Sequence, residues 1–484
     1  MKKLAGLVII LAVLILGAYY GMGIMTERTI KKNVEVINQS NGLYAEIEEY
    51  DRGWFNSDAQ IKWRLHVPER VVKDANGTAQ TVPAQDYNIN MPIKIHHGPI
   101  IFANKSVRFG MGYAQTVIPM PSEYNQKFDS MFSNQSTKPQ LDLSIFVNYL
   151  NKSTIETSLP RFNLFSKEGT GKLEWLGMES TTTLSSDMDK VSGDVTVDGV
   201  TVLKDDNKIT LGKVTSEYDL HQTPAGLYLG DASFFVPTFD VMAKDQKIFS
   251  VTDLSMGTNS DIENNLFNTH FNLNLKSVLA NGKTYGPGEF ELNIRNLDAE
   301  ILAKINQQAN ALQNGTDAER QQAMMAMLPE LPKLFSKGAE IEISTFNFKL
   351  PEGEVQGNLF VSLPKGDSSN PFELIQKIQG KAQLKMPATL VKQIMQHSVM
   401  QQMSKQPEMQ QALIQQLQTT ATPANQPPPS TEQIAAMQAD KQIATLQQNG
   451  VITVIGSDYA IELSLDQGKF TINNKPFDPA MMKF

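Results

Sequence analysis

The sequence predicts an α+β protein dominated by β-structure, in which an N-terminal transmembrane helix precedes a long curved antiparallel sheet and amphipathic helices pack in the C-terminal half. Three observations indicate this fold. Residues 4–25 carry no charge, polar and apolar residues alternate between turn signals up to residue 297, and helical periodicity begins at residue 298. Alternation is typical of strands that bury one face, and a 3.6-residue period is typical of amphipathic helices.

The uncharged segment is long enough to cross a bilayer. Its 22 residues would form a helix of about 33 Å, against a hydrocarbon core of about 30 Å. The alternative is a cleavable secretory signal, but Leu16-Gly17-Ala18 is a poor cleavage site because leucine stands where a small residue is preferred. We therefore expect a retained signal anchor. The side chains expected to face lipid are Leu4, Leu7, Ile10, Leu14, Tyr19 and Met25.

The basic residues near this segment do not decide its orientation. Lys2 and Lys3 precede it, whereas Arg28, Lys31 and Lys32 follow it. The chain contains no cysteine, which excludes disulfides and thiol catalysis and suits an oxidising compartment. We therefore expect the amino end inside the cell and the bulk of the chain outside the cytoplasmic membrane.

Composition and charge describe the remainder as a globular body. The chain is 41% hydrophobic and 19% charged, with a net charge of −8 and no basic stripe. Such a balance argues against a nucleic-acid partner. The expected segments are a membrane anchor at 1–25, an N-terminal α/β segment at 26–127, an antiparallel β meander at 128–297, helices and strands at 298–418, a flexible linker at 419–431, and a C-terminal helix with three short strands at 432–484.

Local signals support these segments in order. A polar helix over 26–40 is followed by strands over 45–50 and 59–67, where apolar residues alternate with polar ones. Turn residues separate the runs of the meander, and Asp298 is a suitable N-cap for a helix over 299–312. The proline-rich residues 419–431 have few side chains that could be buried, which is typical of a linker.

Two motifs lie in the N-terminal α/β segment. The first, Tyr50-Asp51-Arg52-Gly53-Trp54-Phe55-Asn56-Ser57, contains a compact turn over 51–57 between two predicted strands, and the second, His97-Gly98-Pro99, ends a later strand. With the apolar start and the closing segment Asp466–Lys475, they resemble the YdgA-like family of bacterial envelope proteins over nearly the whole chain. Asn474 stands where that family often has glycine. The resemblance implies a membrane-tethered envelope protein of unassigned activity. With the orientation expected above, it would be a single-pass protein of the bacterial inner membrane with the bulk of its chain in the periplasm.

The resemblance supplies no catalytic residues, and the motif residues are expected to be structural. They are Tyr50, Arg52, Gly53, Phe55, His97, Gly98 and Pro99. An arginine in a tight turn pairs with a nearby carboxylate such as Glu48 or Asp51, or else it lines an anion pocket. Adjacent histidines on a strand point to opposite faces, so His97 and its neighbour cannot share a metal ion without a bulge, and a structural role for His97 is favoured over a ligand role. We expect no metal, no cofactor and no enzymatic activity.

The helices over 388–417 carry a methionine-rich apolar face that includes Ile394, Met395, Met403 and Leu413. Such a face either packs against the sheet or forms an adaptable surface for an apolar ligand or a second copy of the chain. Three functions stay open. The first is a tethered body that holds or passes lipid or another apolar molecule, the second is a homodimeric scaffold, and the third is a hydrolase that uses buried carboxylates.

Overall fold

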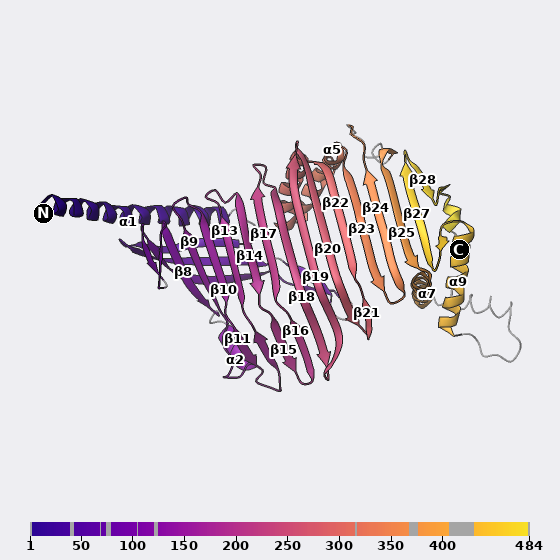
Figure 1. Ribbon diagram of the computed structural model, residues 1–484, viewed down its shortest axis with the longest axis horizontal. Coiled ribbons are helices and arrows are strands. Elements are labelled where there is room, and N and C mark those ends of the chain that lie inside the picture. The colour runs from indigo at the N-terminus through magenta and orange to yellow at the C-terminus, as the bar shows by residue number, and fades with distance from the viewer. Residues whose placement is uncertain are drawn as a thin grey trace. The chain divides into compact units, whose positions relative to one another are not determined.

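The computed structural model describes residues 2–38, 43–67, 69–73, 79–103, 105–120, 124–314, 317–366, 376–405 and 430–482 (Figure 1). The chain divides into two compact units. The first comprises Met1–Ser250 and Ala303–Leu328, and the second comprises Val251–Leu302 and Pro329–Phe484. Antiparallel strands dominate both units, which confirms the β-dominated part of the predicted fold class, whereas its transmembrane part stays a prediction.

The first unit begins with one continuous helix, α1 (Lys2–Ile37), followed by an antiparallel ladder. Each strand pairs with the next in the order β1 (Leu43–Arg52), β2 (Asn56–Val67), β5 (Gln85–His97), β8 (Gly112–Pro119), β9 (Gln140–Val147), β10 (Ser153–Leu159), β13 (Met178–Leu184), β14 (Lys190–Val197), β17 (Val214–Gln222) and β18 (Tyr228–Ala243). A side ladder joins β11 (Phe162–Phe165), β12 (Lys172–Trp175), β15 (Val200–Lys204) and β16 (Asn207–Leu211) to β18.

Three smaller elements also belong to this unit. They are the hairpin of β3 (Arg70–Lys73) and β4 (Ala79–Val82), the hairpin of β6 (Ile101–Ala103) and β7 (Ser106–Arg108), and the short helix α2 (Asn125–Met131). The boundary between the units falls within β19 (Gln246–Glu263), inside the segment predicted as one meander.

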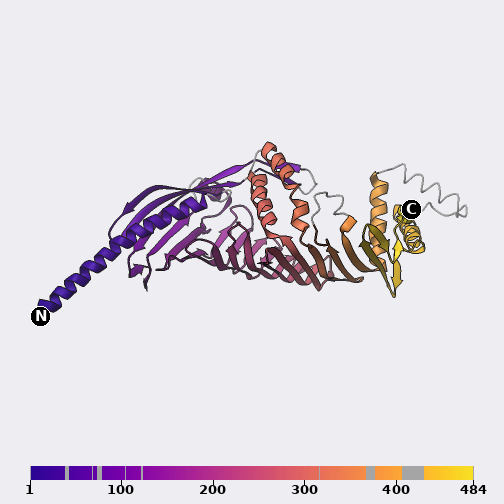
Figure 2. The same ribbon diagram turned by 90° about the horizontal axis from the view of Figure 1, so that it is seen from above.

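The first strands bury the face that α1 covers. In β5, Met91, Ile93 and Ile95 are buried and alternate with exposed residues. They form a core with Val34 of α1 and Ile61 of β2. Figure 2 shows the C-terminal part of α1 running alongside these strands. A sheet with one wet face and one covered face is what the alternating pattern predicts.

The second unit holds a further antiparallel ladder. Its strands pair in the order β20 (Leu266–Ala280), β22 (Gly288–Asp298), β23 (Glu340–Leu350), β24 (Gly353–Ser362), β25 (Gln379–Pro387), β27 (Asp458–Asp466), β28 (Lys469–Ile472) and β29 (Lys475–Pro476). The short strand β21 (Lys283–Tyr285) pairs with β20, and β26 (Thr453–Ile455) pairs with β27. The helices α5 (Leu331–Phe335), α7 (Ala388–Lys405) and α9 (Thr431–Gln448) and the 3₁₀ helix η2 (Pro479–Met482) also belong to this unit, whereas most of α3 (Ala299–Asn314) and all of α4 (Asp317–Met327) belong to the first unit.

Several local predictions are confirmed. The Asp298 carboxylate accepts bonds from the backbone N–H groups of Glu300 and Ile301, each at 3.1 Å, and so caps α3. Asn473 and Asn474 both adopt positive φ, at 47° and 65°, between β28 and β29. Hairpin turns of type I′ require this conformation at both central positions, and asparagine tolerates it better than most residues. The predicted linker and the end of the methionine-rich helix fall largely within residues 406–429, outside the described residues.

Candidate functional site

The two motifs meet each other and helix α1. The N–H of His97 donates to the carbonyl oxygen of Phe55 at 3.0 Å, which places the motifs side by side. The ring of Tyr19 packs edge-on against Phe55, with 4.9 Å between centroids, and the Tyr19 hydroxyl donates to the carbonyl oxygen of Ile100 at 2.6 Å. One residue further along α1, Tyr20 lies 5.3 Å from the ring of Trp54. The two motifs therefore form the surface against which α1 packs.

Two glycines allow α1 to approach the motifs closely. A Cβ atom on Gly98 would lie 2.0 Å from the Tyr19 ring, and Gly98 has a φ of +132°, which side chains rarely tolerate. A Cβ atom on Gly23 would lie 2.6 Å from the imidazole of His97. We call Tyr19, Gly23, Phe55, His97 and Gly98 the helix clamp. The sequence places these residues on separate segments, and the fold brings them together.

His97 is the buried polar centre of the helix clamp. It is 1% exposed, and its Nε2 lies 3.1 Å from Ser57 Oγ. Its Nδ1 is buried and has no hydrogen-bond partner among the described residues. Burial lowers the pKa of His97 against the opposing influence of the backbone of Tyr19 and Asn56, and the nearby charges of Arg52 and His96 lower it further, so the folded state favours a neutral ring at neutral pH. Within the described residues, no group of three or more potential ligands could hold a metal ion.

The lowered pKa predicts a pH-dependent stability. Because the folded state resists protonation of His97, this histidine contributes to the free energy of unfolding in a pH-dependent way. The contribution is fully present above the ordinary pKa of 6.5 and is lost as the pH falls from there towards the pKa of the folded state. We expect His97→Gln to flatten this slope in urea unfolding series between pH 7.5 and 5. Burial also lowers the pKa of His96, so His96→Gln is the control and should retain the slope due to His97. An unchanged slope in the His97→Gln variant would contradict the prediction.

Arg52 joins the turn to α1 through an ion pair. Its Nη1 lies 2.6 Å from Glu27 Oε2, and Lys31 Nζ lies 2.7 Å from Glu27 Oε1. The hydrogen bond from Lys31, with the charges of Lys31 and Arg52, lowers the pKa of Glu27 against the opposing effect of burial. The expectation of a carboxylate partner is confirmed, but the predicted partners were wrong. Arg52 lies on the sheet face that α1 covers, whereas Glu48 pairs with Lys62.

An apolar cavity of about 260 Å³ lies between α1 and the sheet. Its lining includes Ile30 and Val34 of the helix and Met91, Ile145 and Ile155 of three different strands. Trp63 also lines it, and the indole Nε1 is buried without a hydrogen-bond partner in the described part of the chain. The sequence predicted that one face of the sheet is apolar, but not that a helix would cover it and leave space beneath.

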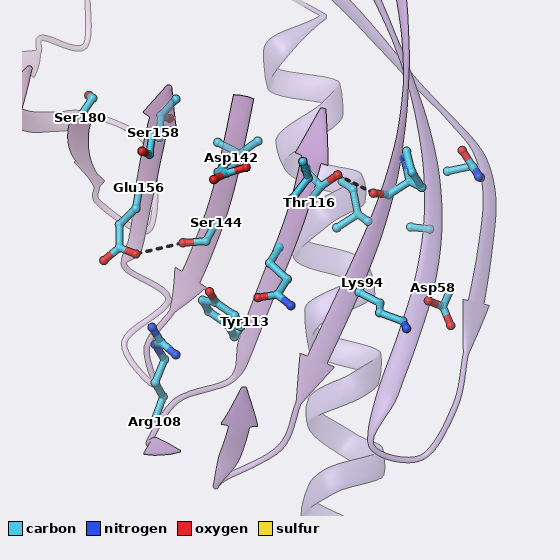
Figure 3. Close-up of a pocket in the computed structure, with 18 of the residues that line it drawn as sticks. Asp58, Lys94, Arg108, Tyr113, Thr116, Asp142, Ser144, Glu156, Ser158 and Ser180 are labelled. Carbon is cyan, nitrogen blue, oxygen red and sulfur yellow. Dashed lines mark hydrogen bonds between the residues drawn. The ribbon is translucent and has the colours of Figure 1, made fainter. Parts of the chain in front are cut away.

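The opposite face of the same strands forms a polar groove of about 1020 Å³ (Figure 3). Asp58 and Lys94 stand opposite each other on β2 and β5, and Ser144 donates to Glu156 at 3.0 Å. Figure 3 shows α1 behind the sheet, away from these side chains. The groove provides the acid-lined concavity that the hydrolase hypothesis requires, although its acids are spread along the wet face of several strands.

The predicted anchor residues have different surroundings. The side chains of Leu4, Leu7 and Ile10 lie outside the described residues. Leu14 and Met25 are exposed, at 64% and 55%. Among the described residues, we find no helix with both the length and the apolar character needed to cross a membrane.

The methionine-rich face of α7 packs mainly inside the second unit. Met403 is 1% exposed and packs in a cluster that α7 and α9 share. Met395 packs against a second cluster that contains Leu446, and Ile394 is 53% exposed. Leu413 lies outside the described residues.

The architecture defines a class of protein: an antiparallel β-sheet body whose N-terminal helix is clamped over an apolar cavity. The chain belongs to a family of bacterial proteins of unknown function, DUF945, whose family model matches residues 1–480. This finding confirms the resemblance to the YdgA-like family, which the motifs indicated over nearly the whole chain. A comparison with curated proteins finds no match.

Proposed function

We propose that this protein is a non-enzymatic component of the bacterial envelope, tethered to the inner membrane by the start of α1, with its bulk in the periplasm. In this function it holds an apolar molecule, such as a lipid acyl chain, between α1 and the sheet. The observation that carries the proposal is the apolar cavity beneath the clamped helix. Membership of the family indicates a bacterial protein but does not indicate an activity.

The turn of α1 before the helix clamp supports the tether. Val13, Leu14, Ile15 and Leu16 are 43–64% exposed, and a contiguous exposed apolar surface of this kind is typical of a membrane-contacting segment. The helix clamp begins at Tyr19, so residues 4–18 precede the contact with the body. A helix of this length spans about 22 Å, and the lysines before it can extend towards the headgroups to complete a short span.

The cavity has the chemistry of an apolar ligand site. Apolar cavities of about 150 Å³ bind small apolar molecules such as benzene, and this one measures about 260 Å³. The unpartnered indole N–H of Trp63 in its lining favours a ligand with a hydrogen-bond acceptor, because a buried donor without a partner is costly. An acyl chain with an ester or carboxylate oxygen satisfies both conditions.

Native mass spectrometry of the full chain in a mild detergent tests the proposal. We expect bound lipid in the wild type and its loss in Ala114→Phe, because Ala114 lines the cavity. Val117→Phe is the matched control, since Val117 lies on the same strand but lines the groove on the other face. Equal lipid content in the two variants, or no lipid in the wild type, would overturn the assignment.

A homodimeric scaffold is the second candidate. Met324, Met325 and Leu328, in α4 and directly after it, are 53–64% exposed and form an apolar surface suited to self-association. Sedimentation of the full chain in detergent discriminates between the two. A dimer that Met325→Glu dissociates supports the scaffold, and a monomer at every concentration counts against it.

A further inference from the structure

The hairpin of β6 and β7 exposes apolar side chains on one face. Ile101 and Ala103 point inward and pack with Tyr113. Phe102 and Val107 stand directly opposite each other on the other face and are 69% and 53% exposed. Globular proteins seldom place aromatic side chains in water on a surface hairpin without a partner for them.

Two other loops at the same end of the sheet expose similar side chains. Leu150, in the turn between β9 and β10, is 82% exposed, and Trp54, in the turn between β1 and β2, is 58% exposed. The Tyr149 hydroxyl donates to the carbonyl oxygen of Pro99, just before the hairpin. Tyr20 contacts Trp54, Tyr19 donates to Ile100, and Thr29 donates to Asn151, so each of the three loops lies against α1. We call Trp54, Phe102, Val107, Phe109, Tyr149 and Leu150 the apolar collar.

The charge of these loops differs from that of the chain. Residues 53–57, 98–111 and 148–152 contain no acidic residue, although the net charge of the protein is −8. Lys105 and Lys152 are exposed within them. Aromatic side chains with nearby lysines are typical of surfaces that rest in the interface of an anionic bilayer. A protein with a net negative charge needs a surface region without acidic residues in order to approach anionic lipid.

We infer that the apolar collar docks on the outer surface of an anionic phospholipid bilayer, around the point where α1 enters it. This inference rests on the proposed tether and adds a second contact with the membrane. It also places the cavity next to lipid, because Met111 and Val147, which adjoin two of the collar loops, line the cavity. The collar thus provides a route by which an acyl chain passes between the bilayer and the cavity.

Single spin labels test this docking, since the chain has no native cysteine. The full chain, labelled at Leu150→Cys or Phe102→Cys, is reconstituted into vesicles of phosphatidylcholine and phosphatidylglycerol. We expect both labels to be more accessible to oxygen than to a water-soluble nickel chelate. Leu65→Cys is the matched control, because Leu65 is 43% exposed in the same unit, at the end of β2 away from the apolar collar, and should show the opposite preference.

The outcomes separate the collar from the tether. Protein that does not float with the vesicles overturns the tether and the collar with it. Protein that floats while both collar labels stay accessible to the nickel chelate overturns the collar and leaves the tether standing. Spin–spin coupling between collar labels of two copies also overturns it, by assigning the surface to self-association. Phe102→Ser with Phe109→Ser, which alters only exposed positions, should move the Leu150 label into water.

Discussion

Gly98→Ala is expected to release α1 from the sheet and to lower the free energy of unfolding by about 3 kcal/mol or more. Two costs combine at this position. The φ of +132° strains any side-chain-bearing residue, and the new methyl group would overlap the Tyr19 ring, 2.0 Å away. Chemical denaturation of the full chain in detergent measures the loss. Hydrogen exchange of the amides in residues 19–37 should show that the helix opens.

Gly226→Ala is the control for the strain alone. Gly226 also has a positive φ, of +86°, but no atom lies within 4 Å of the position of its missing Cβ. Tyr19→Ala in the Gly98→Ala background removes the overlap and should recover part of the lost stability. An equal loss for Gly98→Ala and Gly226→Ala, with α1 still protected from exchange, would show that the helix clamp does not hold the helix.

Local structure was largely predictable from the sequence because its signals are local. The strands expected over 45–50 and 59–67 occur within the slightly longer β1 and β2, since alternation and turn residues are properties of neighbouring positions. The Asp298 cap was predictable for the same reason, as its bonds reach only two and three residues ahead.

The site depends on contacts that local patterns do not encode. Tyr19 and Ile100 are separated by 81 positions, and Arg52 and Glu27 by 25. Periodicity identified an apolar face on α7 but not the residues that pack against this face, which include Ile434 of α9. Gly23 resembled an ordinary glycine of a membrane helix. One signal in the sequence could have indicated this contact, because Gly23 and Thr26 are small residues about one turn apart on the same face of α1. In the structure, Gly23 lies against His97 and Thr26 lies against Gly112.

Gly23→Ala and Gly21→Ala are expected to shift the free energy of unfolding in opposite directions, although both positions lie within the same turn of α1. Alanine in place of glycine within a helix is worth up to about 1 kcal/mol, and nothing lies within 4 Å of a Cβ at Gly21, so Gly21→Ala should stabilise the protein. At Gly23 the added methyl group would meet the His97 ring at 2.6 Å. Overpacking costs about 1–3 kcal/mol, which exceeds the helical gain.

The two variants also connect the helix clamp to the proposed ligand. If α1 closes the cavity, Gly23→Ala should lose bound lipid as well as stability, because displacing the helix from His97 opens the space beneath Val34 and Ile30. Gly21→Ala should retain its lipid. Paired unfolding curves and native mass spectra of the full chain measure both effects. Equal gains in stability from the two substitutions would mean that α1 tolerates a side chain against His97, and the close contact would then not be what holds the helix over the sheet.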